Sequence, residues 1–244
     1  IRHNDGRRRP TMIFLHSWMQ PLSIFEDALL LPRFAGRLDV DVLGVHLPYH
    51  GRRKPKAAAF HGEYFWTADL VRTFEAMRQS VHDVRALVGW LEQEGTGPVG
   101  VMGVSLGGMV ALALACFEER LAFCIPVAAH LDLAGVLADA GLLLSMREEL
   151  ASHGWRPEDV KAYTQSLGLD RVMPKIALER ILYVVGTYDR ILSTHRCEAL
   201  WRRWGEPPIH RFAGGHLGIL THMDTTLDVA RKFLDELGVR EDVT

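Results

Sequence analysis

Short, nearly continuous apolar runs recur along this chain, and segments with helical periodicity separate them. Such runs are typical of strands that are buried on both faces of a sheet. We predict strands at Thr11–His16, Asp41–Leu47, Val99–Val104, Phe123–Ala128, Arg180–Val185 and Ile209–Phe212. Alternation of strands with helices predicts an α/β fold, with a mostly parallel central sheet and helices on both faces.

The clearest helix is predicted from Leu70 to Leu91, where apolar residues recur every three or four positions. Thr67 is predicted to cap its start, and Gly95 to follow its end. Weaker patterns predict further helices, which lie at Leu106–Glu118, Thr194–Trp204 and Thr225–Leu237.

Between residues 131 and 178 the alternation is interrupted by helical stretches alone. One is predicted over Leu133–Ala151, and another begins near Pro157, with acidic residues in its first turn. This segment is far longer than the usual connection of about 4–6 residues. We therefore expect one domain, residues 1–244, in which residues 131–178 form a helical cap inserted over an active site.

Composition excludes several classes of protein. A net charge of −2 over 244 residues gives no support for nucleic-acid binding, and no apolar stretch reaches the ~20 residues of a membrane span. The three cysteines lack metal-type spacing, and neither a phosphate-binding nor a dinucleotide-binding glycine pattern is present. We expect no metal and no cofactor, and free thiols in a cytoplasmic protein. The oligomeric state is left open.

The sequence Gly-Val-Ser-Leu-Gly at residues 103–107 lies between a predicted strand and a predicted helix. A serine in such a sharp turn has a strained backbone and presents its side chain above the sheet edge. Glycines two residues before and after avoid collisions in the bend, and the following helix start offers free N–H groups. This context predicts that Ser105 is a nucleophile.

A nucleophilic serine needs a base, and the base needs an orienting acid. Asp189 follows one predicted strand, and His216 lies in a glycine-rich loop after the next. Carboxyl ends of parallel strands meet at one edge of the sheet, so both can reach Ser105. Asp132 is the competing acid and His222 the competing base.

These motifs, in the chain order Ser, Asp, His, resemble those of the α/β-hydrolase superfamily over almost the whole chain. The resemblance implies that Ser105 is the nucleophile, His216 the base and Asp189 the acid, with the backbone N–H of Leu106 as one oxyanion-hole donor. The second donor normally comes from a His-Gly loop. Here Ser17 replaces the glycine, which leaves the N–H of Ser17 or that of Trp18. The Pro-Tyr-His-Gly-Arg-Arg sequence at residues 48–53 is similar to one branch of α/β-hydrolase-domain proteins.

The resulting hypothesis is a serine hydrolase that cleaves a small-molecule carboxylic ester or thioester through an acyl-serine. Aromatic and sulfur side chains of the rim loops are candidates for the acyl pocket, namely Met19, Phe65 and Trp66. The basic run that begins at Arg52 is interpreted as a solvated loop, and His50 as structural. Two alternatives remain: an acyltransferase or lyase with the same triad, and a non-catalytic ligand-binding module.

Overall fold

The central sheet of this computed structural model has six parallel strands in the order β2-β1-β3-β4-β5-β6. The structure describes residues 1–20 and 26–240, apart from the side chains of Glu26, Asp27 and Asp170. The strands are β1 (Thr11–Leu15), β2 (Asp41–Val45), β3 (Val99–Val104), β4 (Phe123–Val127), β5 (Tyr183–Gly186) and β6 (Ile209–Phe212). All six predicted strands are present: β3 and β6 have the predicted bounds, and the ends of the other four differ by at most three residues. The predicted α/β class is confirmed.

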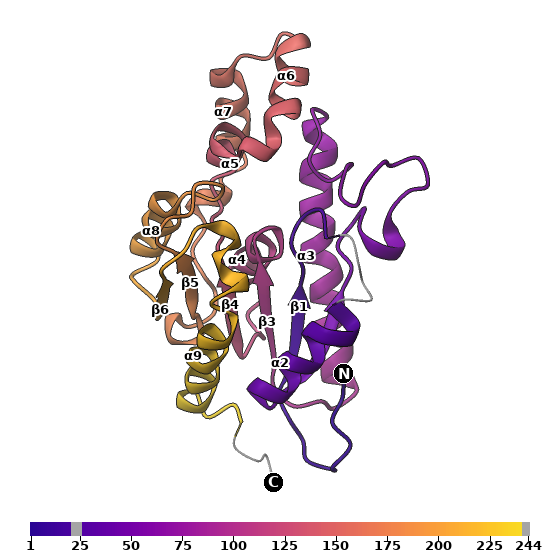
Figure 1. The fold of residues 1–244 in the computed structure, drawn as a ribbon, viewed down its shortest axis with the longest axis vertical. Coiled ribbons are helices and arrows are strands. Elements are labelled where there is room, and N and C mark those ends of the chain that lie inside the picture. The colour runs from indigo at the N-terminus through magenta and orange to yellow at the C-terminus, as the bar shows by residue number, and fades with distance from the viewer. Residues whose placement is uncertain (21–25, 241–244) are drawn as a thin grey trace.

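Helices cover both faces of the sheet (Figure 1). Their bounds are α2 (Leu31–Leu38), α3 (Leu70–Gln93), α4 (Leu106–Phe117), α8 (Thr194–Arg203) and α9 (Met223–Glu236). Alternate residues of β1 point to opposite faces, as the period of a strand requires. Ile13 and Leu15 join the core formed with α3, α4 and α8, whereas Met12 and Phe14 join the core formed with α2 and α9.

One local prediction about the helices was wrong, and one helix was not predicted. The residue that caps α3 is Asp69, whose side chain accepts a hydrogen bond from the N–H of Arg72 at 3.0 Å. Thr67 lies two residues earlier and instead exchanges hydrogen bonds with Thr73. Helix α2 was not predicted, because it is short and contains Gly36, a residue that disfavours helices; Pro32 lies in its first turn, where proline is tolerated.

Residues 131–178 form a separate group of helices at the top of the view in Figure 1. They are α5 (Leu133–Asp139), α6 (Leu144–Ser152) and α7 (Pro157–Ser166), with short turns between and after them, η3 (Gly141–Leu143) and η4 (Leu169–Arg171). We call residues 131–178 the helical insertion. The single helix predicted over Leu133–Ala151 is broken after Asp139.

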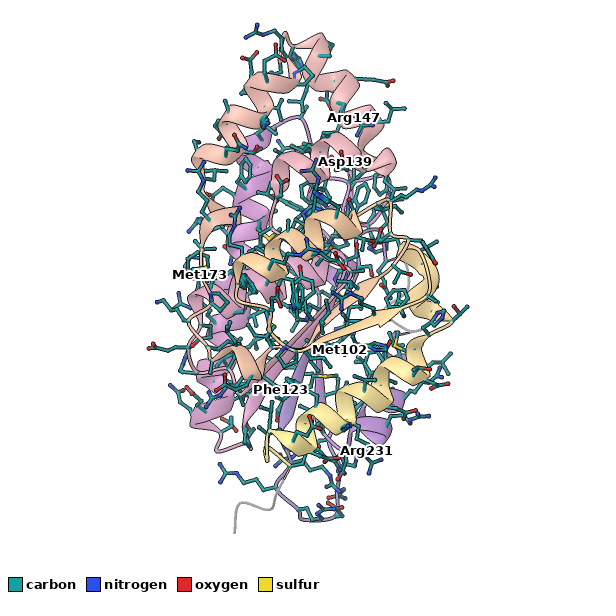
Figure 2. The ribbon with its side chains drawn as sticks, turned by 90° about the vertical axis from the view of Figure 1, so that its left-hand side faces the viewer. Met102, Phe123, Asp139, Arg147, Met173 and Arg231 are labelled. Carbon is teal, nitrogen blue, oxygen red and sulfur yellow. The ribbon has the colours of Figure 1, made fainter. Side chains whose placement is uncertain are left out.

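The break between α5 and α6 coincides with a side-chain cap at the end of α5. Arg147 of α6 donates to the carbonyls of Leu137 and Ala140 at 2.9 and 2.8 Å, so its guanidinium caps the end of α5. Figure 2 shows Arg147 and Asp139 on these helices, above the sheet strands that carry Met102 and Phe123. Arg147 lies seven residues after Ala140 and ten after Leu137, and it satisfies carbonyls that a continuous helix would have paired internally.

The structure also bears on two predictions made above, one about the cysteines and one about membrane-spanning segments. Cys116, Cys124 and Cys197 are buried free thiols, and burial raises the pKa of the Cys116 thiol to about 12. Within the described ranges, no helix is long and apolar enough to cross a bilayer.

Candidate active site

Ser105 lies at the junction between β3 and α4, in a backbone conformation that few side-chain-bearing residues adopt. Its φ is 55° and its ψ is −112°. Hydrogen bonds hold both sides of this residue: its N–H donates to the Val127 carbonyl at 2.9 Å, and its carbonyl accepts from the Met109 N–H at 2.9 Å. The strain is therefore fixed by the neighbouring strand and by the helix that follows.

Two glycines of the motif are required by close approaches of the backbone. A Cβ on Gly103 would lie 2.1 Å from the Gly107 carbonyl oxygen, and one on Gly107 would lie 2.0 Å from the Leu15 carbonyl oxygen. Real Cβ atoms do not approach so closely, so any larger residue would force β1, β3 and α4 apart. The sequence motif thus predicts the turn through excluded volume.

Ser105, His216 and Asp189 form one continuous line of hydrogen-bonding groups. His216 Nε2 lies 2.9 Å from Ser105 Oγ, and His216 Nδ1 lies 2.7 Å from Asp189 Oδ2. The side chains of Asp189 and His216 are 2% and 10% exposed. An acid that contacts one ring nitrogen places the proton there and leaves the other nitrogen free to accept the proton of the serine.

The second carboxylate oxygen of Asp189 is held by the backbone. Its Oδ1 accepts from the N–H groups of Ile191 and Leu192 at 2.9 and 3.0 Å. Sequence reasoning did not identify these two donors, although an Asp that precedes a tight turn is a known signal for such hydrogen bonds. They fix the carboxylate plane and therefore the direction in which Oδ2 meets His216.

The competing acid and base lie elsewhere. Asp132 caps α5, where it accepts from the Gly135 N–H at 2.9 Å and pairs with Arg196. His222 Nδ1 lies 2.9 Å from the Gly218 carbonyl, and its ring packs on Phe212. The structure therefore brings together the first choices of the sequence analysis rather than the alternatives.

The loop after β1 lies beside Ser105 and provides the candidate oxyanion-hole donors. Ser17 and Trp18 line the same cavity as Ser105 and Leu106. The N–H groups of Ser17, Trp18 and Leu106 donate to no residue that the structure describes. Unpaired N–H groups around a nucleophile are the arrangement that stabilises a developing oxyanion.

A cavity of about 470 Å³ opens at Ser105. Met19 and Trp66 line it, as expected, but Phe65 does not: Phe65 is fully buried and packs against His50 and Trp66. The assignment of Phe65 to the pocket was therefore wrong. Much of the wall comes from residues that sequence reasoning missed, and they lie on the helical insertion and in the loop after His216: Val136, Ala140, Leu143, Leu217, Ile219 and Leu220. The apolar residues directly after His216 were the available signal.

Two buried histidines that pack against each other, His16 and His50, have lowered pKa values and are therefore neutral. Burial lowers the pKa of His16 to about 3 and the pKa of His50 to about 4. The Nδ1 of His50 lies 2.8 Å from the Pro48 carbonyl, consistent with a structural histidine. In the basic run, Arg53 pairs with Asp83 at 2.5 Å, away from the residues that line the cavity.

The sequence and the fold of this chain were both compared with those of known proteins. Residues 37–146 match the model of the family described as "Alpha/beta hydrolase domain containing 18". Among solved structures, Est1E from Butyrivibrio proteoclasticus is 13% identical, with a TM-score of 0.66, covering 97% of this chain and 91% of that one. The Pyrococcus furiosus esterase Pf2001 is 17% identical, with a TM-score of 0.62, covering 96% and 84%. The chain therefore has the α/β-hydrolase fold, and residues 37–146 of it match an α/β-hydrolase family.

The family match over residues 37–146 and the shared fold confirm the predicted resemblance to α/β-hydrolases. At their low sequence identities, the solved structures show a common fold and nothing further. A curated relative, the protein Rv2627c of Mycobacterium tuberculosis strain H37Rv, is 29% identical over 236 residues. The match covers 89% of this chain and 52% of the relative, so the chain spans about half the length of that relative.

Proposed function

We propose that this α/β-hydrolase is a serine esterase that cleaves carboxylic esters of apolar acyl groups. The observation that carries the proposal is the hydrogen-bonded line of Ser105, His216 and Asp189, of which Ser105 and His216 line a largely apolar cavity. A purely ligand-binding pocket has no need for a strained serine that contacts an acid-oriented histidine.

The reaction follows from the positions of the groups. His216 Nε2 takes the proton of Ser105 Oγ as that oxygen attacks the ester carbonyl, and Asp189 stabilises the imidazolium. The N–H of Leu106, together with one from the loop after β1, donates to the oxyanion; each such donor contributes roughly 3–4 kcal/mol. His216 then returns the proton to the leaving alcohol, and water activated by the same nitrogen releases the acid.

The lining of the cavity supports an uncharged acyl group. The described residues that line it include no Lys, Arg, Asp or Glu, so a charged acyl chain would lose its hydration without gaining a partner. Its volume lies within the roughly 300–1,000 Å³ of small-molecule sites. Because Val136, Ala140 and Leu143 contribute to the wall, we propose that the helical insertion acts as a cap that limits acyl length.

The proposal is tested with p-nitrophenyl esters of graded acyl length, from acetyl to dodecanoyl, and with a fluorophosphonate label. We expect kcat/KM to rise and then fall with acyl length in the wild type. Ser105→Ala should abolish both turnover and labelling while the thermal unfolding midpoint stays close to that of the wild type. A Ser105→Ala variant that still turns over or is labelled at another residue would overturn the assignment, as would a wild type that does neither.

A further inference from the structure

A second cavity, of about 550 Å³, lies within the helical insertion. We call it the insertion cavity; it is lined by residues between positions 132 and 165 and by Arg196 of α8. The helices of the insertion lie at the top of Figure 1, and Arg147 is labelled on them in Figure 2. The volume is within the roughly 300–1,000 Å³ of small-molecule sites.

Helix α5 separates the insertion cavity from the cavity at Ser105. Val136 of this helix lines the cavity at Ser105, whereas its neighbours Gly135 and Leu137 line the insertion cavity. The two cavities share no described lining residue. They also differ in charge, because the insertion cavity is lined by five charged side chains, namely Asp132, Arg147, Glu158, Lys161 and Arg196. Ligands of different chemistry therefore fit the two cavities.

Both acidic side chains of the insertion cavity already have a cationic partner. Asp132 pairs with Arg196, which also pairs with Asp139 at 2.7 Å. Glu158 lies 3.5 Å from Arg156, a residue that does not line the cavity. The negative charges on this wall are thus balanced by the protein itself.

The cations Arg147 and Lys161 have no carboxylate partner within the part of the chain that the structure describes. Arg147 uses Nη1 alone, for the carbonyls of Leu137 and Ala140, so its Nε and Nη2 remain as donors. Lys161 is exposed and forms no hydrogen bond or ion pair with a described residue. A guanidinium with two free donors and a nearby ammonium are suited to bind a carboxylate.

The rest of the wall is largely apolar and includes an aromatic ring that is fixed in place. Leu137 and Leu150 line it and are each 3% exposed. Trp155 also lines it and packs edge-on against Tyr163, with ring centroids 5.9 Å apart. Tyr163 in turn contacts Phe74 of α3. The main domain therefore supports the aromatic side of the cavity, against which a ligand can bury apolar surface.

We propose that the insertion cavity binds a small organic anion, a carboxylate on an apolar body, whose carboxylate is held by Arg147 and Lys161. This site is additional to the proposed esterase function and needs no reaction at Ser105. An inorganic anion would leave the apolar wall unfilled, and an uncharged molecule would leave both cations without a partner. The acid released from an ester of an apolar acyl group belongs to the proposed class of ligand.

Binding is tested by titrating the protein with octanoate while tryptophan fluorescence is recorded. Octanamide, which has the same length and no charge, and inorganic phosphate are titrated in parallel. We expect a saturable change with octanoate at a Kd below about 1 mM, and binding at least about tenfold weaker for the other two. Trp155→Phe should remove most of the fluorescence change while calorimetry shows little change in Kd, which places the ligand in the insertion cavity.

Substitutions of opposite charge on α7 test the role of the cations. Lys161→Gln should weaken octanoate binding about fivefold, whereas Glu158→Gln, which removes a negative charge from the same wall, should strengthen it about twofold. Lys56→Gln is the matched control, because Lys56 is an exposed lysine that does not line the cavity, and its Kd should equal that of the wild type. Thermal unfolding of each variant confirms that it is folded.

Arg147→Gln should weaken octanoate binding about tenfold. Because Arg147 also caps α5, its unfolding midpoint is measured too, and the pair at Lys161 and Glu158 decides the question if this variant does not fold.

Equal affinities for octanoate and octanamide would overturn the proposal, as would an unchanged Kd in Lys161→Gln or a fluorescence change that persists in Trp155→Phe. None of these measurements depends on turnover. A protein that binds octanoate here and hydrolyses no ester keeps this site and loses the proposed function, and a protein that hydrolyses esters without this binding loses only the site.

Discussion

Ser105 combines a strained backbone with a fixed hydrogen-bonding environment. A residue with a side chain at φ 55° costs on the order of 1–3 kcal/mol. Hydrogen bonds to Val127 and Met109 on either side hold this conformation, and the His16 carbonyl holds the next turn through Gly107. The hydroxyl therefore stays aimed at His216 Nε2 without the reorganisation that a mobile serine would need at the moment of attack.

At the scale of the residue, Asp189→Asn should lower kcat without lowering the thermal stability of the fold. The Asn Oδ1 can still accept from the N–H groups of Ile191 and Leu192, but its amide N–H₂ then faces His216 Nδ1 and forces the proton onto Nε2. That tautomer cannot accept the proton of Ser105, so we expect kcat to fall about 10⁴-fold. Steady-state kinetics with a p-nitrophenyl ester and thermal unfolding of the same preparation measure the two effects.

The matched control is Asp132→Asn, which alters the other acid that follows a strand at this edge. Asp132 caps α5 and pairs with Arg196 rather than with a histidine, so kcat should change less than about tenfold. A larger loss of kcat in Asp132→Asn than in Asp189→Asn would contradict the identity of the acid.

At the scale of elements, the sequence predicts what depends on local pattern. Helices α3 and α4 were predicted because apolar periodicity and the glycine motif are contained within each segment. The break between α5 and α6 was not, because it depends on Arg147 reaching back to the carbonyl of Leu137. The N-terminal cap of α3 was misplaced by two residues, because Thr67 and Asp69 are both good capping residues and only the backbone geometry distinguishes them.

One side chain of α8 forms ion pairs at both ends of helix α5. Arg196 pairs with Asp139 at 2.7 Å and with Asp132, at the two ends of α5. A Cβ on Gly135 would lie 2.4 Å from Arg196 Nε, so the guanidinium lies directly on the helix backbone. Because Val136 and Ala140 of this region line the cavity, the pairing couples α8 to the wall of the site.

We therefore expect Arg196→Gln to loosen the helical insertion. KM for long-chain esters should rise several-fold, the insertion should be cleaved faster by limited proteolysis, and stability should fall by ~1 kcal/mol, since these ion pairs are partly exposed. Arg202→Gln is the control, because Arg202 lies on the same helix but pairs with Glu198. Unchanged KM and unchanged proteolysis in Arg196→Gln would show that the pairing does not hold the wall.

At the scale of the molecule, the sequence could locate the three groups of the site but not the space around them. Asp189 and His216 were identifiable because parallel strands end at one edge, whatever the order of the strands. Phe65 and Trp66 are adjacent in sequence, and only the packing of Phe65 on His50 shows that it faces the core. The contribution of Val136 and Ala140 to the cavity depends on how the insertion folds back, which no local pattern encodes.

The buried histidines make a further property of the whole molecule predictable, the dependence of its stability on pH. Burial lowers the pKa of His16 to about 3 and those of His50 and His130 to about 4. In the unfolded chain each is near 6.5. Between about pH 5 and pH 6.5 the unfolded state therefore binds protons that the folded state does not, and stability falls as the pH is lowered through this window.

The free energy of unfolding can change by up to about 1.4 kcal/mol per pH unit for each such histidine. Carboxylates with lowered pKa, such as Asp39 and Glu118, lose their contribution only below about pH 4.5 and so do not act in this window. Urea unfolding at several pH values between 5 and 7 measures the slope. His50→Gln should reduce this slope by one histidine's share. A stability that stays constant or rises as the pH falls from 6.5 to 5 would contradict the neutral, buried state of these rings.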